Sequence, residues 1–282
     1  SITVSWAVAS DDMDGVNQVR VYPDPDDPNI AYRSYPIQGD ATSLEVTGLK
    51  PSTRYTIAIH YDSANRGEVY AWTLPSYTEP NYAADNATFL QLIADGAKEI
   101  VLTNTDITYT LYSEGADGVK TDAVIGVANN TDISVYGEGT ADGTMPTVIG
   151  AFNLPNGLTS LHLEGLNLSG DGYSYSHAVI MAKDFATPNL SVSVLNCTIS
   201  GYKAGFFYDN ETSGGAGVTV DNVSFSNVMV SDIQGSGGNG FDLRTTGKVG
   251  TVSITESTFS NGFRTFFRID SAPTDKIIFS NN

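Results

Sequence analysis

The sequence is poor in cysteine, in basic residues and in long apolar runs, and each shortage excludes a class of protein. Its 282 residues include one cysteine, so no disulfide can form within the chain. Lysine and arginine total 14 against 32 aspartates and glutamates, and no basic run is present that could follow a phosphate backbone. No stretch of about 18 consecutive apolar residues occurs that would span a membrane as a helix. Nucleic-acid binding and helical membrane insertion are therefore not expected.

The residue types that the sequence is rich in indicate β-structure. Gly, Ser, Thr, Asn and Asp are abundant, 15 tyrosines are present, and lysine and glutamate are few, a composition that favours strands and turns over helices. Hydrophobic residues make up 40% of the chain, which is enough for cores throughout its length. An all-β protein is expected. Because Ser1 opens directly into a strand pattern without a signal peptide, we expect a mature or trimmed fragment.

The first 73 residues contain short strands separated by turn-rich loops. Polar and apolar residues alternate in 1–6, in Gln18–Tyr22 and in 55–60, the pattern of a β-sandwich. The strongest local signal is the stretch 46–55, in which Leu49 and Pro51 precede Tyr55.

This stretch resembles the corner before the sixth strand of fibronectin type III domains. The resemblance implies that the hydroxyl of Tyr55 bonds back to the preceding chain and that Trp6 is the core tryptophan of the second strand. It covers residues 1–77. The first strand of that family is missing, since the chain starts at the second.

A linker and a helix follow. The stretch 73–80 contains Pro75 and Pro80, which limit its flexibility. The next segment, 87–96, predicts a short amphipathic helix with Asn86 as N-cap and Gly96 as C-cap. Its apolar face consists of Phe89, Leu90, Leu92 and Ile93. Such a helix would cover the apolar end of a solenoid.

Four similar segments organise the rest of the chain. They are 160–169, 191–200, 217–226 and 251–260. Each has an alternating strand, a polar bend and a second short strand that ends in serine. In this register one column, with separations of 31, 26 and 34 residues, holds Leu168, Ile199, Phe225 and Phe259. An imperfect β-repeat of this length predicts a parallel β-helix, in whose inward column Cys197 would be a buried free thiol.

A second column of strands precedes these segments. It comprises 123–127, 147–151, 178–182, 205–209, 241–245 and 265–269. A helix, a first strand at 98–103 and stacked coils together resemble the right-handed parallel β-helices of the pectate lyase type. The predicted domains are 1–77 and 78–282. Because 276–281 match the front of another coil, we expect the native chain to continue beyond Asn282.

The second column also predicts rows of outward side chains about 4.8 Å apart. We take as inward Ile180, Phe207, Leu243 and Phe267. The next position then points outward and holds Met181, Tyr208, Arg244 and Arg268. Asp242 lies one position before the inward residue of its coil, and Lys183 and Asp270 lie further along theirs. A slip of one residue would move a whole strand's side chains to the opposite face.

Basic residues gather on the same coils. None occurs from 121 to 182, and they return as Lys183, Lys203, Arg244, Lys248, Arg264, Arg268 and Lys276. In an acidic protein this indicates an anion site, because a tyrosine ring suits a sugar and guanidinium groups suit carboxylates or sulfates. The predicted ligand-binding residues are Tyr208, Asp242, Arg244, Arg268, Lys183 and Asp270. The alternative is that Arg244 and Arg268 pair with Asp242 and Asp270 on a solvated face.

The pectate lyase resemblance implies a mechanism as well. Such enzymes abstract the proton beside a uronate carboxylate with a basic residue, assisted by calcium. Here Arg244, Arg268 or Lys203 would be the base. The carboxylate ligands would come from Asp184, Asp209, Glu211, Asp242 or Asp270. The clustered aspartates and the Arg-x-Pro-x-x-Arg stretch of that family are absent, so we expect no metal and no cofactor, with Ca²⁺ only in a lyase.

The combination of the two resemblances is similar to the modular surface lipoproteins of gut Bacteroidetes. We therefore expect an extracellular or outer-membrane surface protein that is associated with carbohydrate and binds an acidic polysaccharide on the outer face of the β-helix. One alternative is a polysaccharide lyase that cleaves a uronate polymer by β-elimination. The other is a structural or adhesive stalk, in which the β-helix is only a rigid spacer.

Overall fold

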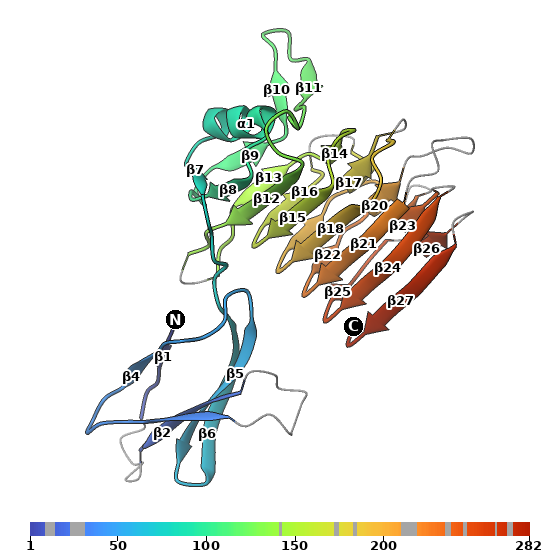
Figure 1. The fold of residues 1–282 in the computed structure, drawn as a ribbon. Coiled ribbons are helices and arrows are strands. Elements are labelled where there is room, and N and C mark those ends of the chain that lie inside the picture. The colour runs from blue at the N-terminus through green and yellow to red at the C-terminus, as the bar shows by residue number, and fades with distance from the viewer. Residues whose placement is uncertain are drawn as a thin grey trace. The chain divides into compact units, whose positions relative to one another are not determined.

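The computed structural model describes residues 1–8, 15–22, 32–140, 143–171, 175–182, 185–209, 219–234, 238–244, 247–262, 264–269 and 273–282. This part of the chain forms two compact units, Ser1–Ser76 and Tyr77–Asn282, each with its own hydrophobic core (Figure 1). Strands dominate both units, which confirms the all-β prediction. Across the described ranges no helix is long and apolar enough to cross a membrane.

The first unit contains two antiparallel sheets. The smaller pairs β1 (Ile2–Ser5) with β4 (Ser43–Val46). The larger has the order β3 (Arg33–Pro36), β2 (Gln18–Tyr22), β5 (Arg54–Tyr61) and β6 (Ala64–Trp72). Apolar residues of both sheets form one buried cluster, namely Val4, Val19, Val21, Val46, Tyr55 and Ile57. The three strands predicted from alternation in this region are confirmed as β1, β2 and β5.

The second unit is a right-handed β-solenoid of about four turns (Figure 1). Its eight-stranded sheet has the order β27 (Thr274–Ser280), β24 (Lys248–Thr255), β21 (Thr219–Ser226), β18 (Leu190–Leu195), β15 (Ser160–Glu164), β12 (Asp132–Gly137), β8 (Glu99–Leu102) and β7 (Asn81–Ala83). Its six-stranded sheet has the order β25 (Thr258–Phe259), β22 (Met229–Ser231), β19 (Thr198–Ser200), β16 (Asn167–Ser169), β13 (Thr147–Ile149) and β9 (Thr108–Thr110). Its five-stranded sheet has the order β14 (Phe152–Leu154), β17 (His177–Met181), β20 (Gly205–Asp209), β23 (Asn239–Leu243) and β26 (Thr265–Ile269).

The repeat is more regular than the sequence indicated. In the six-stranded sheet, Leu168 pairs with Ile199, Ile199 with Val230 and Val230 with Phe259, so successive separations are 31, 31 and 29 residues by subtraction. Phe225, predicted for this column, lies instead in the eight-stranded sheet opposite Ile254. The prediction was wrong because alternation continues through Thr219–Ser226 and so hides the true bend at Asn227.

The second predicted column is confirmed for four of its six members. β17, β20, β23 and β26 lie side by side in the five-stranded sheet. The other two assignments were wrong. Thr147–Ile149 is a strand of the six-stranded sheet, residues 123–127 form no strand, and β14 takes the first place in the column.

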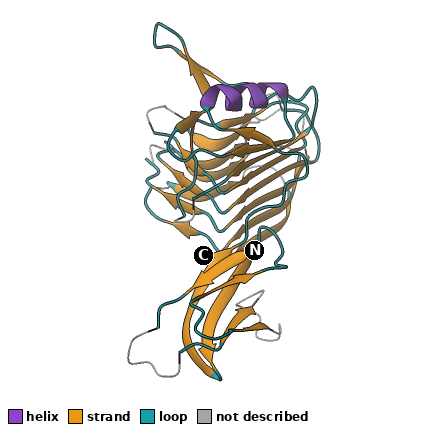
Figure 2. Cartoon of the chain, turned by 90° about the vertical axis from the view of Figure 1, so that its left-hand side faces the viewer, coloured by secondary structure: helices purple, strands orange, loops and turns teal. Residues whose placement is uncertain are grey.

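Helix α1 (Asn86–Asp95) lies at the end of the solenoid where β7, β8 and β9 are found (Figure 2). Its Phe89 and Ile93 are fully buried in the solenoid core. Gly96 ends the helix in the left-handed conformation, as predicted. The N-cap is Asp85 rather than Asn86, because the Asp85 carboxylate accepts the backbone N–H of Thr88.

A hairpin projects from the same end of the solenoid. It consists of β10 (Tyr112–Glu114) and β11 (Lys120–Asp122), which extend away from the stacked coils (Figures 1 and 2).

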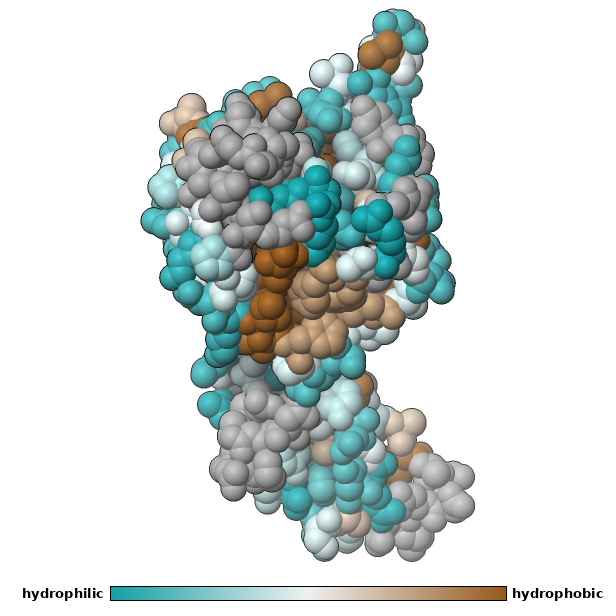
Figure 3. Space-filling view, turned by 90° about the vertical axis from the view of Figure 1, so that its right-hand side faces the viewer, coloured by the Kyte–Doolittle hydropathy of each residue, from teal (hydrophilic) through white to brown (hydrophobic). Residues whose placement is uncertain are grey.

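The opposite end of the solenoid is apolar. Ile277 and Phe279 on β27 continue the inward columns of Val252 and Ile254, both of which are fully buried. In the part of the chain that the structure describes, no strand pairs with the outer edge of β27, and Ile277 is 48% and Phe279 53% exposed. Figure 3 shows the resulting apolar patch on this face.

Candidate functional site

The polar residues singled out by the sequence meet on the outer face of the five-stranded sheet. Strand pairing places in one row Ile180, Tyr208, Asp242 and Arg268. The neighbouring row packs into the core and consists of Val179, Phe207, Phe241 and Phe267. Stacking and edge contacts among these aromatic rings hold adjacent strands in register, with centroids of Phe207 and Phe241 5.0 Å apart.

Two details of the predicted row were wrong. Asp242, not Arg244, lies between Tyr208 and Arg268, and Ile180 rather than Met181 precedes them. In β23, Phe241 and Leu243 are both inward-facing, so a shift of two residues preserves the apolar pattern. In β17 the run 178–181 is apolar throughout, so neither face is marked by polarity.

Asp242 is the centre of the site. Its carboxylate accepts hydrogen bonds from Nε of Arg244 at 2.9 Å, from Nη2 of Arg244 at 2.8 Å and from the amide of Asn239 at 2.8 Å. Nη1 of Arg268 lies 3.9 Å from the same carboxylate. The pairing of Arg244 with Asp242, foreseen as the alternative to an anion site, is therefore present.

Burial and charge act on Asp242 in opposite directions. The residue is only 1% exposed, and burial alone would raise the pKa of its carboxyl. The hydrogen bonds from Arg244 and Asn239 and the charges of Arg244 and Arg268 outweigh burial and hold that pKa below its ordinary value. Asp242 is therefore an anion that orients two cations.

Tyr208 contacts two members of this cluster. The ring of His177 stacks on it with centroids 5.0 Å apart, and the guanidinium carbon of Arg244 lies 4.9 Å from the ring centroid. His177 is buried, and its Nε2 lies 2.8 Å from the carbonyl oxygen of Asn239. Burial lowers the pKa of His177 to about 4, so the imidazole is neutral at pH 7 and its Nε2 donates to that carbonyl.

Three members of the site escaped the sequence reasoning, namely His177, Asn239 and Arg264. Nη2 of Arg264 lies 3.3 Å from the side-chain oxygen of Asn239 and donates to it. Arg264 was noted only as part of the basic group. Arg264 and Asn239 are 25 residues apart in sequence, and His177 and Asn239 are 62 apart. Contacts between such distant residues cannot be predicted from a local sequence pattern.

Of the remaining predicted residues, one lies elsewhere, one lies beside the site and four cannot be placed. Lys203 lies in the turn before β20, where its backbone N–H donates to the carbonyl of Tyr175. Asp209 is fully buried and accepts the backbone N–H of Arg244. Lys183 and Asp270 lie outside the described residues, as do Asp184 and Glu211. Within the described ranges, no three His, Cys, Asp or Glu side chains form a group that could hold a metal ion.

The site thus combines three guanidinium groups with one central carboxylate beside a tyrosine ring. The side chains of Arg244 and Arg268 are 32% and 36% exposed, so both can be reached from solvent. Since arginine presents a planar fork of donors, this arrangement can accept a carboxylate, sulfate or phosphate group.

Comparison with known proteins identifies a family. Residues 107–262 match a family model described as a domain of unknown function, DUF4957. The match spans more than half of the chain. The chain belongs to the DUF4957 family. No curated protein and no solved structure matches it.

The DUF4957 match coincides with the stacked coils. It begins just before β9 and ends after β25, and it includes Tyr208, Asp242 and Arg244. Arg264 and Arg268 lie just beyond its last residue. The site is therefore built partly by the DUF4957 domain and partly by the coil that follows it.

Proposed function

We propose that this protein binds an acidic polysaccharide on the outer face of the five-stranded sheet. The observation that carries the proposal is the convergence of Arg244, Arg264 and Arg268 around Asn239 and Asp242, beside Tyr208. A carbohydrate-associated role at the cell exterior follows from the same site, because acidic glycans are polymers of that environment.

Charge supports an anionic ligand. The chain has a formal net charge of -18, so its overall field repels anions. The arginine site gathers three cations, Arg244 and Arg268 beside the Asp242 carboxylate and Arg264 beside Asn239, which favours an anion there. Charge-assisted bonds from arginine to carboxylate or sulfate groups are stronger and more directional than neutral hydrogen bonds.

The repeat spacing supports a polymer. Tyr208, Asp242 and Arg268 stand on successive strands, which are about 4.8 Å apart. A glycan that runs along the solenoid axis would meet the tyrosine ring on one coil and guanidinium groups on the next two. A single small anion would use only part of this row.

The test is binding calorimetry with polygalacturonate, and with neutral galactan as a matched polymer. We expect polygalacturonate to bind with an affinity that weakens as salt rises, and we expect galactan to show no binding that depends on the arginines. Arg268→Ala should weaken it about 5- to 10-fold, which corresponds to about 1–1.4 kcal/mol. Lys248→Ala is the control, because Lys248 is an exposed cation paired with Asp275 on the eight-stranded sheet. Galactan binding that is lost in Arg268→Ala, or equal loss of polygalacturonate binding in both variants, would contradict the proposal.

The two other interpretations are outcomes of the same experiment. Absorbance of new unsaturated ends during incubation with polygalacturonate, with and without Ca²⁺, would indicate a polysaccharide lyase instead of a binding protein. Absence of both binding and absorbance change for every acidic polymer would favour a structural stalk.

Relationships of the two units form part of the proposal. For the first unit we propose a fibronectin type III-like β-sandwich, supported by the hydroxyl of Tyr55, which accepts the backbone N–H of Lys50 at 2.9 Å. For the second we propose a pectate-lyase-like β-helix capped by α1, supported by three parallel sheets and a buried helix face. Such a combination suits a surface lipoprotein of gut Bacteroidetes.

A further inference from the structure

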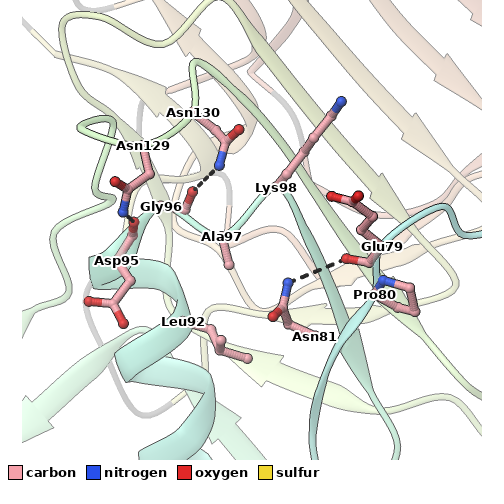
Figure 4. A pocket seen from close by; sticks show the side chains of 10 residues that line it. All are labelled: Glu79, Pro80, Asn81, Leu92, Asp95, Gly96, Ala97, Lys98, Asn129 and Asn130. Carbon is pink, nitrogen blue, oxygen red and sulfur yellow. Dashed lines mark hydrogen bonds between the residues drawn. The ribbon is translucent and has the colours of Figure 1, made fainter.

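A hollow of about 550 Å³ lies at the α1 end of the solenoid, away from the arginine site. Its lining comes from the end of α1, the segment before β8, the segment around β7 and the loop before β12 (Figure 4). The lining residues include Glu79, Asn81, Leu92, Asp95 and Asn130. The volume lies within the range of about 300–1,000 Å³ typical of small-molecule sites.

Three backbone groups around this hollow are already hydrogen-bonded. Gly96 N–H donates to Ile93, Ala97 N–H donates to Leu92, and the carbonyl of Lys98 accepts from Ser134. These two N–H groups are therefore engaged, and the side chains of the lining are a further source of polar contacts to a ligand.

Those side chains offer mainly acceptors. The amide nitrogens of Asn129 and Asn130 donate to the carbonyls of Asp95 and Gly96 at 2.7 and 3.0 Å, and that of Asn81 donates to the carbonyl of Glu99 at 3.1 Å. Each nitrogen is thus held against the backbone, which directs the oxygen end of each amide away from that bond.

Two carboxylates, those of Glu79 and Asp95, add further acceptors to the lining. The single cation in the lining, Lys98, extends away from Leu92 in Figure 4. In the same view Leu92 and Ala97 lie between the two polar sides. The hollow therefore combines an acceptor-rich rim with an apolar middle, and its carboxylates repel anions.

We propose that this hollow is a second carbohydrate site, which takes a neutral sugar. The hydroxyls of a sugar would donate to the amide and carboxylate oxygens, and its C–H face would lie against Leu92 and Ala97. Such a site is chemically opposite to the arginine cluster, which selects anions, and it does not depend on that cluster.

The test is calorimetry of the full chain with a panel of neutral hexasaccharides, built from β-1,4-linked glucose, xylose or mannose. We expect at least one to bind. Ala97→Trp, which fills the hollow, should abolish that binding. Glu79→Ala should weaken it several-fold, since the exposed carboxylate is removed while the backbone N–H of Glu79 keeps its bond to Glu99. Arg268→Ala in the arginine site and Glu68→Ala on β6 should leave it unchanged.

The outcomes separate this site from the arginine site. No binding by any neutral hexasaccharide, binding that survives both Ala97→Trp and Glu79→Ala, or binding that is lost in Arg268→Ala would each overturn the inference. Failure of polygalacturonate to bind would overturn the proposed function alone. Protection of the buried Cys197 thiol, measured in every variant, distinguishes a blocked hollow from a misfolded solenoid.

Discussion

At the scale of single residues, Asp242 decides how the site is organised. Its carboxylate holds Arg244 by two hydrogen bonds and lies 3.9 Å from Arg268, so without it two guanidinium groups would repel each other on adjacent coils. Arg244 is therefore held in place before any ligand arrives, and Arg268 is drawn toward the same carboxylate. Fixed donors bind an anion with a smaller loss of side-chain entropy than mobile ones.

We predict that Asp242→Asn lowers the free energy of unfolding of the solenoid by about 1–3 kcal/mol, because it removes a buried charged acceptor. Because the folded-state pKa of Asp242 lies below the ordinary value, its carboxylate stabilises the fold above about pH 4 and loses that contribution as the pH falls further. The difference between variant and parent, measured by urea unfolding, should therefore shrink at acid pH.

Asp275→Asn is the control for Asp242. Asp275 also pairs with a cation, Lys248, but both side chains are more than half exposed. Its replacement should change stability by less than about 0.5 kcal/mol at any pH. An effect of Asp242→Asn no larger than that of Asp275→Asn would show that the buried carboxylate does not organise the site.

The buried imidazole of His177 gives the free energy of unfolding a second pH dependence, in a different pH range from that of Asp242. Its folded-state pKa of about 4 lies below the ordinary 6.5, so the unfolded chain binds the proton more readily. The contribution of the neutral His177 imidazole to the free energy of unfolding is then fully present above about pH 6.5. It is lost, by up to about 3 kcal/mol, as the pH falls toward about 4. His177→Gln should flatten this part of the curve of unfolding free energy against pH. If the free energy of unfolding of parent and His177→Gln changed with pH in parallel, His177 would not be the source of this pH dependence.

At the scale of elements, one residue in left-handed conformation sets the bend between the eight- and six-stranded sheets. Successive coils place there Gly165, Asn196, Asn227 and Glu256, with φ of 70°, 53°, 49° and 53°. Each backbone N–H in this column donates to a carbonyl of the next coil. In addition, the side-chain amide nitrogen of Asn227 donates to the side-chain oxygen of Asn196 at 2.9 Å. Glycine and asparagine adopt this conformation readily, and glutamate does not.

We predict that Glu256→Asn stabilises the solenoid by about 1 kcal/mol. Asparagine relieves the backbone strain at this position. Its side-chain amide can also donate to that of Asn227, as the amide of Asn227 donates to that of Asn196. Glu256→Ala serves as the control, because it removes the same carboxylate but keeps a residue disfavoured in this conformation. If the two variants have the same stability by urea unfolding, conformational preference at this bend is not the cause.

The same bend explains which elements the sequence could predict. Alternation alone located most strands, including β2, β15, β18 and β24. It failed at Phe225, because alternation ran past the bend, and at β23, because Phe241 and Leu243 fit either of two registers. Tyr208, Asp242, Arg244 and Arg268 nevertheless lie together, since a side chain as long as that of Arg244 reaches the cluster even when the register is off by two. His177 and Asn239 were missed because their contact crosses two coils.

At the scale of the whole molecule, each unit carries a separate spectroscopic or chemical reporter. Both tryptophans, Trp6 and Trp72, lie in the first unit, and the single cysteine lies in the second. Cys197 is buried, and burial raises the pKa of its thiol to about 12, so it reacts with thiol reagents only when the solenoid opens. Tryptophan fluorescence and thiol labelling therefore follow the two units independently in one sample.

We predict that Tyr55→Phe destabilises the first unit alone. The substitution removes the acceptor for the backbone N–H of Lys50, at a cost of about 1 kcal/mol. The urea midpoint of tryptophan fluorescence should fall, while that of Cys197 labelling should not move. Val192→Ala, in the solenoid core, should have the reverse effect because it leaves a cavity next to the neighbouring coils. If either variant moved both midpoints together, the two cores would unfold as one, and stability measured at the arginine site would then have to be assigned to the whole chain.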